Sequence, residues 1–255
     1  MDITTLSIFG ICFIFLMTCL GALLIFLFKR EIKEKFKVFL LSFSGGIMLA
    51  SSIWSLLVPS IEQSSGYGSF AFLPACVGFL LGCLFMFLLD FFVERTQKNG
   101  TKLSANKKMF FALSIHNIPE GLSVGVALGS ALIAGNSISI MGALSLALGI
   151  GIQNIPEGLA VSLPMYQETG KRSKAFFYGV FSGIFEPIAA ILGLLLSSFF
   201  SFLLPWLLAF AGGTMIYTIV NELMPETQTE QHKLLGTWGF IAGFIIMMLL
   251  DVAFG

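Results

Sequence analysis

Long apolar stretches separated by short polar segments dominate the chain. Stretches of roughly 18 or more residues with few charges are typical of transmembrane helices, and each stretch here could cross a hydrocarbon core of about 30 Å. The pattern predicts an all-α integral membrane protein, a single transmembrane domain over residues 1–255. Its eight transmembrane helices are expected at roughly 5–28, 37–59, 70–93, 109–134, 138–165, 173–198, 202–224 and 234–254.

The positions of Lys and Arg support this topology. All 14 of these residues fall after the first, third, fifth and seventh predicted helices, in segments 29–37, 95–108, 171–174 and at Lys233. The alternate loops, near Gln63, Asn136 and Ser201, contain none. Because Lys and Arg are enriched in cytoplasmic loops, the charged loops are predicted to be cytoplasmic and both termini extracytoplasmic.

The overall composition excludes an ordinary soluble domain. Hydrophobic residues make up 56% of the chain and charged residues 11%, with a mean hydropathy of +0.94. Soluble domains carry about 25% charged residues. The formal net charge is zero and the basic loops are accounted for by topology, so the expected surroundings are a lipid bilayer and no nucleic-acid partner is expected.

A short motif occurs twice, in the fourth and fifth predicted helices. The first copy is His116-Asn117-Ile118-Pro119-Glu120-Gly121-Leu122, and the second is Gln153-Asn154-Ile155-Pro156-Glu157-Gly158-Leu159, 37 residues later. Consecutive transmembrane helices run antiparallel, and repeats of opposite topology with interrupted helices are known to build binding sites at the membrane midplane. The repeat therefore marks the candidate site, between the fourth and fifth helices.

Each copy places polar side chains on one helix face. Residues three and four apart are neighbours on a helix, so the fourth helix presents His116, Asn117 and Glu120, and the fifth presents Gln153, Asn154 and Glu157. Each proline removes one helical hydrogen bond, which predicts a kink near Pro119 and Pro156. The following glycines, Gly121 and Gly158, are expected to allow close helix approach.

The buried acidic residues indicate a cation. An acidic residue at the centre of a transmembrane helix costs about 2.5–3.5 kcal/mol on insertion scales. Glu120, Glu157 and Glu186 all lie in apolar spans, and no predicted span carries Lys or Arg in its interior. A metal ion or protons must therefore compensate them, and carboxylate, imidazole and amide groups suit zinc, iron and manganese better than copper(I).

Other interpretations are open on these residues alone. Buried polar side chains can act only as hydrogen-bonding groups between helices. An intramembrane metalloprotease would need a motif such as HExxH, but the chain has two histidines, His116 and His232, and no such motif, so no enzyme is expected. A proton-coupled carrier of a small organic cation, or a metal sensor without flux, would use the same glutamates.

At the repeated motif the chain resembles the ZIP (Zrt-, Irt-like protein) metal transporters, whose fourth helix carries HNxPEG. The second copy, followed by Leu159-Ala160-Val161-Ser162-Leu163-Pro164, resembles the GufA-like branch. The resemblance spans essentially the whole chain. It implies transport of divalent metal ions into the cytoplasm, with zinc first and iron, manganese and cadmium as further cargo, and with no resident cofactor.

The resemblance also implies the composition of the site. The family places two metal positions between the fourth and fifth helices. Carried over by motif, the first position would be formed by His116, Glu120, Gln153, Glu157 and the thioether of Met48. The second would share Glu120 and Glu157 and add Asn117, Asn154 and Glu186. Some GufA-like members have Asp where this chain has Asn154, so the second position is expected to bind more weakly, or not at all.

Several further expectations concern the route and the setting. Asp90, Glu94, Asn221, Glu222 and Glu226 could relay metal at the cytoplasmic ends of the third and seventh helices, although terminal acidic residues are often simply solvated. Asp251 is either solvated or an entry ligand, and Ser51 and Ser55 share a helix face with Met48. A prokaryotic plasma membrane and a homodimer would fit the family.

Overall fold

The computed structural model describes residues 3–27, 34–99, 105–134, 137–199, 201–227 and 231–254, and these residues form helices and turns without any strand. In chain order the elements are α1 (Ile3–Leu23), η1 (Leu24–Phe26), α2 (Glu34–Ser51), η2 (Ser52–Leu57), α3 (Val58–Gln63), η3 (Ser65–Phe70), α4 (Phe72–Asn99), α5 (Ala105–Ala134), α6 (Ser137–Thr169), α7 (Arg172–Gly183), α8 (Phe185–Phe199), η4 (Ser201–Leu203), α9 (Leu204–Thr218), η5 (Ile219–Leu223), α10 (Met224–Thr227) and α11 (Lys233–Phe254).

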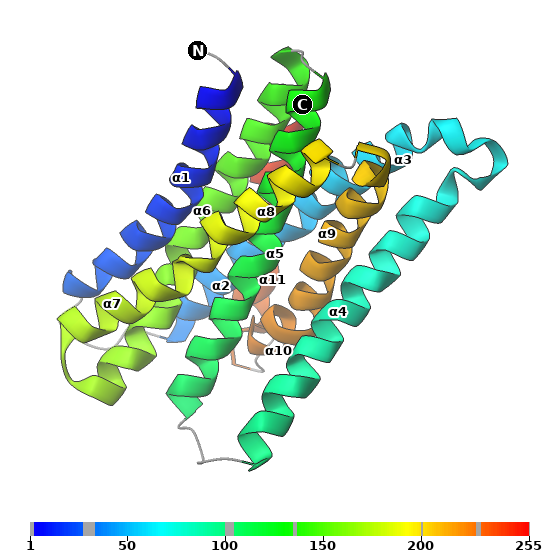
Figure 1. The fold of residues 1–255 in the computed structure, drawn as a ribbon. Coiled ribbons are helices and arrows are strands. Elements are labelled where there is room, and N and C mark those ends of the chain that lie inside the picture. Colours follow the sequence, from blue (N-terminus) through cyan, green and yellow to red (C-terminus); the bar gives the residue numbers. More distant parts are fainter. Residues whose placement is uncertain are drawn as a thin grey trace.

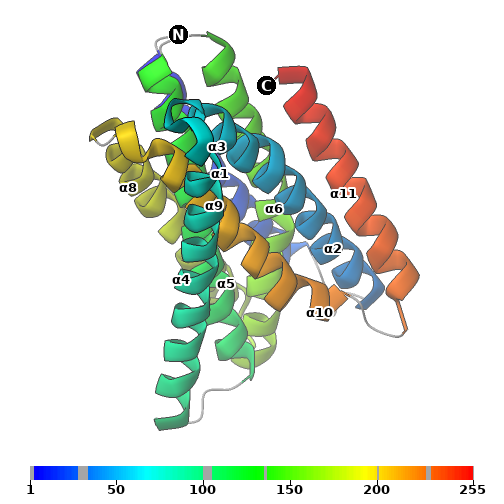
Figure 2. The ribbon, with the colours of Figure 1, turned by 90° about the vertical axis from the view of Figure 1, so that its right-hand side faces the viewer.

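Eight helical spans in the described residues are long and apolar enough to cross a membrane, which confirms the predicted number. The second combines α2, η2 and α3, the sixth combines α7 and α8, and the seventh combines α9 and η5. The first turn of α1 and the last turn of α11 lie at the same end of the bundle, as an even number of spans requires (Figures 1 and 2).

The helices differ from the expected ones in length and in where they break. The second span continues to Gln63 and the fifth to Thr169. Both α5 and α6 continue as single helices through the prolines of the repeated motif, and the kinks expected there stay predictions. The interruption instead falls in the sixth span, where a turn at Ile184 separates α7 from α8 two residues before Glu186.

Two spans contain π-helical turns, η2 in the second and η5 in the seventh. Short π-helical turns occur often at functional sites, because the extra residue per turn redirects the side chains that follow. η2 begins four residues after Met48 and packs against α9. The π-helical turn therefore shifts the helix face that Met48, Ser51 and Ser55 were expected to share.

Four helix pairs form the frame of the bundle: α1 with α6, α2 with α11, α4 with α9, and α5 with α8 (Figures 1 and 2). In each pair a glycine lies directly against a backbone carbonyl of the partner helix, where a Cβ atom would collide with it. These contacts join Gly158 to Thr18, Gly46 to Phe240, Gly82 to Phe210, and Gly121 to Glu186. The close approach expected at Gly121 and Gly158 is thus confirmed, and small residues are the usual means of bringing membrane helices together.

The span that carries the second motif copy is the most enclosed one. In the apolar segment of α6, 78% of the residues are buried, against 22% for that of α4. α6 contacts α1, α2, α5, α7 and α11. Polar side chains on α6 are therefore shielded from lipid by other helices, which makes the middle of α6 a place where a polar site can form.

We predict that Gly46→Ala lowers the thermal midpoint of the detergent-solubilised protein, because the added methyl group would push α2 away from Phe240 on α11. Overpacking of this kind typically costs about 1–3 kcal/mol. The control is Gly66→Ala, since nothing lies within 4 Å of a Cβ atom built at Gly66. Equal midpoints for the two variants, measured by fluorescence-detected size-exclusion chromatography after heating, would contradict this account of the packing.

Candidate metal site

The residues expected at the site come from four helices and are buried in the bundle. Asn117 and Glu120 lie in the middle of α5, Gln153, Asn154 and Glu157 in the middle of α6, Glu186 in the first turn of α8, and Met48 near the end of α2. Each of these seven side chains is at most 5% exposed. The backbone of His116 belongs to α5, but its side chain lies outside the described part of the structure.

The three carboxyl groups lie close to one another. Glu120 on α5 interacts electrostatically with both Glu157 on α6 and Glu186 on α8. Gln153 Nε2 donates a hydrogen bond to Glu120 Oε1 at 2.7 Å, which links the two copies of the motif directly. The structure therefore brings the glutamates of the fourth, fifth and sixth spans into one polar cluster.

Glu186 is held by two donors. Asn154 Nδ2 donates to Glu186 Oε2 at 2.8 Å, and Thr18 Oγ1 on α1 donates to Glu186 Oε1 at 2.5 Å. Asn154 Nδ2 also lies 3.3 Å from the carbonyl oxygen of Ile14. Asn154 thus has a definite role without metal, because its amide group stabilises the carboxylate that an Asp at this position would repel.

Asn117 is oriented differently from the other motif residues. Its Nδ2 donates to the carbonyl oxygen of Ser182, two residues before the turn at Ile184 that separates α7 from α8. This bond ties α5 to the end of α7 and fixes the amide group. Only the amide oxygen of Asn117 could then serve as a ligand.

Three oxygen atoms in the cluster lack a hydrogen-bond donor among the described residues. They are Glu120 Oε2, Gln153 Oε1 and Asn154 Oδ1, each buried below 1 Å² of accessible surface. A buried acceptor without a partner costs about 1–3 kcal/mol, and more for a charged group. Such oxygens are commonly explained by an ion or water, and these three all belong to residues of the repeated motif.

The cluster differs from a compact site made only of strong ligands. Within the part of the chain that the structure describes, no group of three or more His, Cys, Asp or Glu side chains is arranged to hold a metal ion. The donors that the described cluster offers are instead carboxylate and amide oxygens. The Met48 side chain is buried in the apolar core, and its role as a thioether ligand stays a prediction. A mixture of carboxylate and amide ligands is suited to moderate affinity, because each amide or thioether ligand contributes less than a thiolate or imidazole.

Sequence reasoning missed two residues of the cluster, Ser44 and Thr18. Ser44 Oγ on α2 donates to Glu157 Oε1 at 2.5 Å, and Thr18 donates to Glu186 as described above. Both are buried hydroxyl residues in helices outside the repeat. The only signal in the sequence was that Ser44 precedes Met48 by one helical turn, which places both on one helix face.

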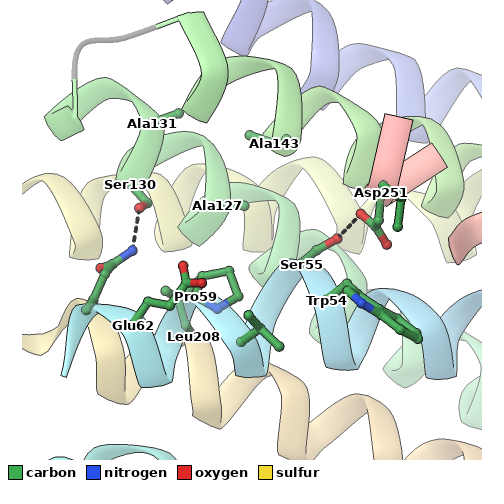
Figure 3. Close-up of a pocket in the computed structure, with 14 residues that line it drawn as sticks. Trp54, Ser55, Pro59, Glu62, Ala127, Ser130, Ala131, Ala143, Leu208 and Asp251 are labelled. Atoms are coloured by element: carbon green, nitrogen blue, oxygen red, sulfur yellow. Dashed lines mark hydrogen bonds between the residues drawn. The ribbon is translucent and has the colours of Figure 1, made fainter. Parts of the chain in front are cut away.

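A cavity of about 470 Å³ lies at one end of the bundle (Figure 3). Its lining includes Asp251 of α11, Ser55 of η2, and Glu62 of α3. Ser55 Oγ donates to Asp251 Oδ1 at 2.7 Å, and Asp251 Oδ2 has no hydrogen-bond partner among the described residues. Asp251 is only 8% exposed, so its carboxylate faces the cavity rather than the outer surface of the bundle; neither of its two expected roles is decided by this. Ser51, by contrast, is buried and donates to the carbonyl oxygen of Met48.

At the other end of the bundle, Asn221 of η5 donates to Asp90 Oδ2 of α4 at 3.0 Å. This contact joins the third and seventh spans, as expected if the two residues belong to one route. The side chains of Glu94, Glu222 and Glu226, which were expected near it, lie outside the described part of the structure.

Comparison with known proteins identifies relatives over nearly the whole chain. Residues 108–251 match the family model described as ZIP Zinc transporter. The chain is 35% identical to Zinc transporter ZIP11 of Xenopus tropicalis, over 98% of this chain and 97% of that protein. It is 37% identical to Zinc transporter GufA of Myxococcus xanthus, over 79% and 81%, and 36% identical to Zinc transporter ZIPB of Bordetella bronchiseptica, over 94% and 79%.

We predict that Asn154→Asp lowers the thermal midpoint of the metal-free protein but increases the stabilisation by added zinc. The substitution removes the donor to Glu186 and adds a buried negative charge, which costs about 1–3 kcal/mol or more without a cation. With zinc, the new carboxylate becomes a ligand. Asn154→Ala is the control, because it removes the same donor without adding charge. If zinc raises the thermal midpoints of Asn154→Asp and Asn154→Ala by the same amount, residue 154 does not take part in a second metal position.

Proposed function

The chain belongs to the ZIP family of zinc transporters, and we propose that it carries divalent metal ions, zinc foremost, into the cytoplasm through the polar cluster between α5 and α6. The observation that carries the proposal is the set of three buried oxygens, on Glu120, Gln153 and Asn154, that no described donor satisfies. Divalent cations at the two expected positions would satisfy them, with Gln153 at the first, Asn154 at the second and Glu120 shared by both, and would neutralise the neighbouring carboxylates.

The available ligand atoms favour zinc and chemically similar cations. Carboxylate and amide oxygens come from α5, α6 and α8, and Met48 adds a thioether on α2. With the imidazole of His116 this set suits zinc, iron, manganese and cadmium, whereas copper(I) would favour more sulfur ligands. The metal ion is the cargo, held for the time of one transport event.

We propose that the ion enters through the cavity shown in Figure 3. The cavity lies at the end of the bundle that holds both termini and the loops without Lys or Arg, which the charge distribution assigns to the extracytoplasmic side. Glu62 and Asp251 line it and would attract cations. Asp90 and Asn221, at the opposite end, would receive the ion on the cytoplasmic side.

Metal transport fits the residues of this chain better than a metalloprotease activity or ATP-driven transport does. A metalloprotease would need a general base beside a two-histidine site, and the chain has only two histidines, of which His232 lies at the start of α11. No GxxxxGK[ST] phosphate-binding motif occurs in the sequence, so we propose that the transport is not driven by ATP. A prokaryotic plasma membrane and a homodimer are the setting that we propose for it.

We predict that the double variant Glu120→Gln, Glu157→Gln takes up no more radioactive zinc than protein-free liposomes, while wild-type protein shows saturable uptake. The amide side chains keep the shape of the glutamates but cannot neutralise a dication. Glu34→Gln is the matched control, because Glu34 lies exposed in the first turn of α2.

The same experiment tests the alternatives. Uptake by the double variant equal to that of wild type, at equal amounts of folded protein, would remove the cluster from the transport route. Zinc binding without uptake by wild type would instead support a sensor. Competition by unlabelled divalent metals distinguishes a metal carrier from a carrier of organic cations.

A further inference from the structure

We propose that Ser44 is a positioning residue for metal binding, which holds the Glu157 carboxylate in the orientation that the ion requires. The inference rests on the proposed function and deepens it, because Ser44 belongs to neither copy of the repeated motif. Ser44 lies in the second span, 113 residues from Glu157 in the sequence. Its side chain is completely buried, at 0% exposure.

Ser44 differs from most of the other buried hydroxyls and resembles Thr18, which also donates to a carboxylate of the cluster. A Ser or Thr inside a helix commonly donates to a carbonyl of its own helix, three or four residues back. Ser52, Ser114, Ser123 and Ser197 all do so. Ser44 instead donates across a helix interface to a carboxylate at the candidate site, at 2.5 Å. A serine hydroxyl that only bonds a carbonyl of its own helix is not required to point toward a carboxylate on another helix.

The position of Ser44 on α2 supports the same role. Ser44 and Met48 are four residues apart and therefore lie on one helix face. Met48 is 1% exposed and is the residue of α2 proposed as a thioether ligand. One face of α2 thus offers a ligand and, one turn away, a hydrogen-bond donor to a second ligand. α2 also packs against α6, which carries Glu157.

A neutral donor is suited to this task. The Ser44 hydroxyl engages Glu157 Oε1 and carries no charge, so it orients the carboxylate and leaves its negative charge for a metal ion. A Lys or Arg at this position would orient the carboxylate equally well but would neutralise it and compete with the cation. Hydrogen-bond partners of metal ligands orient those ligands, and their loss typically lowers metal affinity about 10–100-fold.

The test compares Ser44→Ala with Ser42→Ala in the full-length protein. Both substitutions remove one buried hydroxyl from α2, but Ser42 Oγ has no hydrogen-bond partner among the described residues and lies against Gly236 of α11. We expect Ser44→Ala to raise the zinc Kd, measured by calorimetry, roughly tenfold. The KM for zinc uptake should rise by a similar factor with little change in maximal rate. Ser42→Ala should bind and transport zinc like wild type.

A second pair of variants separates positioning from a general effect on packing. In Glu157→Asp the carboxylate keeps its charge but is one methylene too short to reach Ser44 in the same way. Adding Ser44→Ala to Glu157→Asp should therefore change the zinc Kd little, whereas independent effects would multiply. The thermal midpoint of the metal-free protein is measured for every variant.

Each outcome bears on the proposal. A selective loss of affinity in Ser44→Ala, absent in the Glu157→Asp background, supports it. An unchanged Kd in Ser44→Ala overturns it, as do equal losses in Ser44→Ala and Ser42→Ala with equally lowered midpoints. If wild-type protein binds no zinc, the proposed function itself fails. That result is distinct from normal binding by wild type and Ser44→Ala alike, which overturns only the role of Ser44.

Discussion

The constraint on which the structure depends is the burial of three carboxyl groups, those of Glu120, Glu157 and Glu186, inside an apolar helix bundle. Burial of charge without compensation is costly in membrane helices. Each of these carboxylates accepts a hydrogen bond from at least one neutral donor, an amide or a hydroxyl. Neutral donors orient a carboxylate and leave its negative charge in place. The cluster therefore keeps its attraction for a cation, which basic partners would have cancelled.

The architecture of the bundle follows from the need to place these groups together. Glycines such as Gly121 and Gly158 let α5 approach α8, and α6 approach α1, at backbone contact. The turn at Ile184 begins a new helix just before Glu186, so this carboxylate lies in the first turn of α8. Helix first turns favour negative charge, because their free N–H groups point toward it. α2 packs against α6, and its Ser44 reaches Glu157 in the cluster.

The number of membrane spans and the polar faces of the motif helices were predictable from the sequence, because both depend only on residues that are close together in the chain. Hydropathy over a span depends only on the residues in that span, so eight helices follow from composition and length. Likewise, helix periodicity places Gln153 and Glu157, which are four residues apart, on the same face of α6. Each of α5 and α6 continues as one helix through its motif proline, Pro119 or Pro156, because neighbouring helices and polar groups can accommodate the freed carbonyl; the kinks expected there stay predictions.

The sequence by itself determined the spans, the polar face of each motif helix and the excess of buried negative charge. Only the tertiary structure decided which donors meet that charge. Ser44 and Thr18 lie 113 and 168 residues from the glutamates that they contact, and a serine in an apolar span looks the same in sequence whether it bonds its own helix or another. Asp251, near the end of the last helix, lines the cavity because α11 packs against the second span. Such contacts depend on how helices pack in three dimensions, which no local pattern encodes.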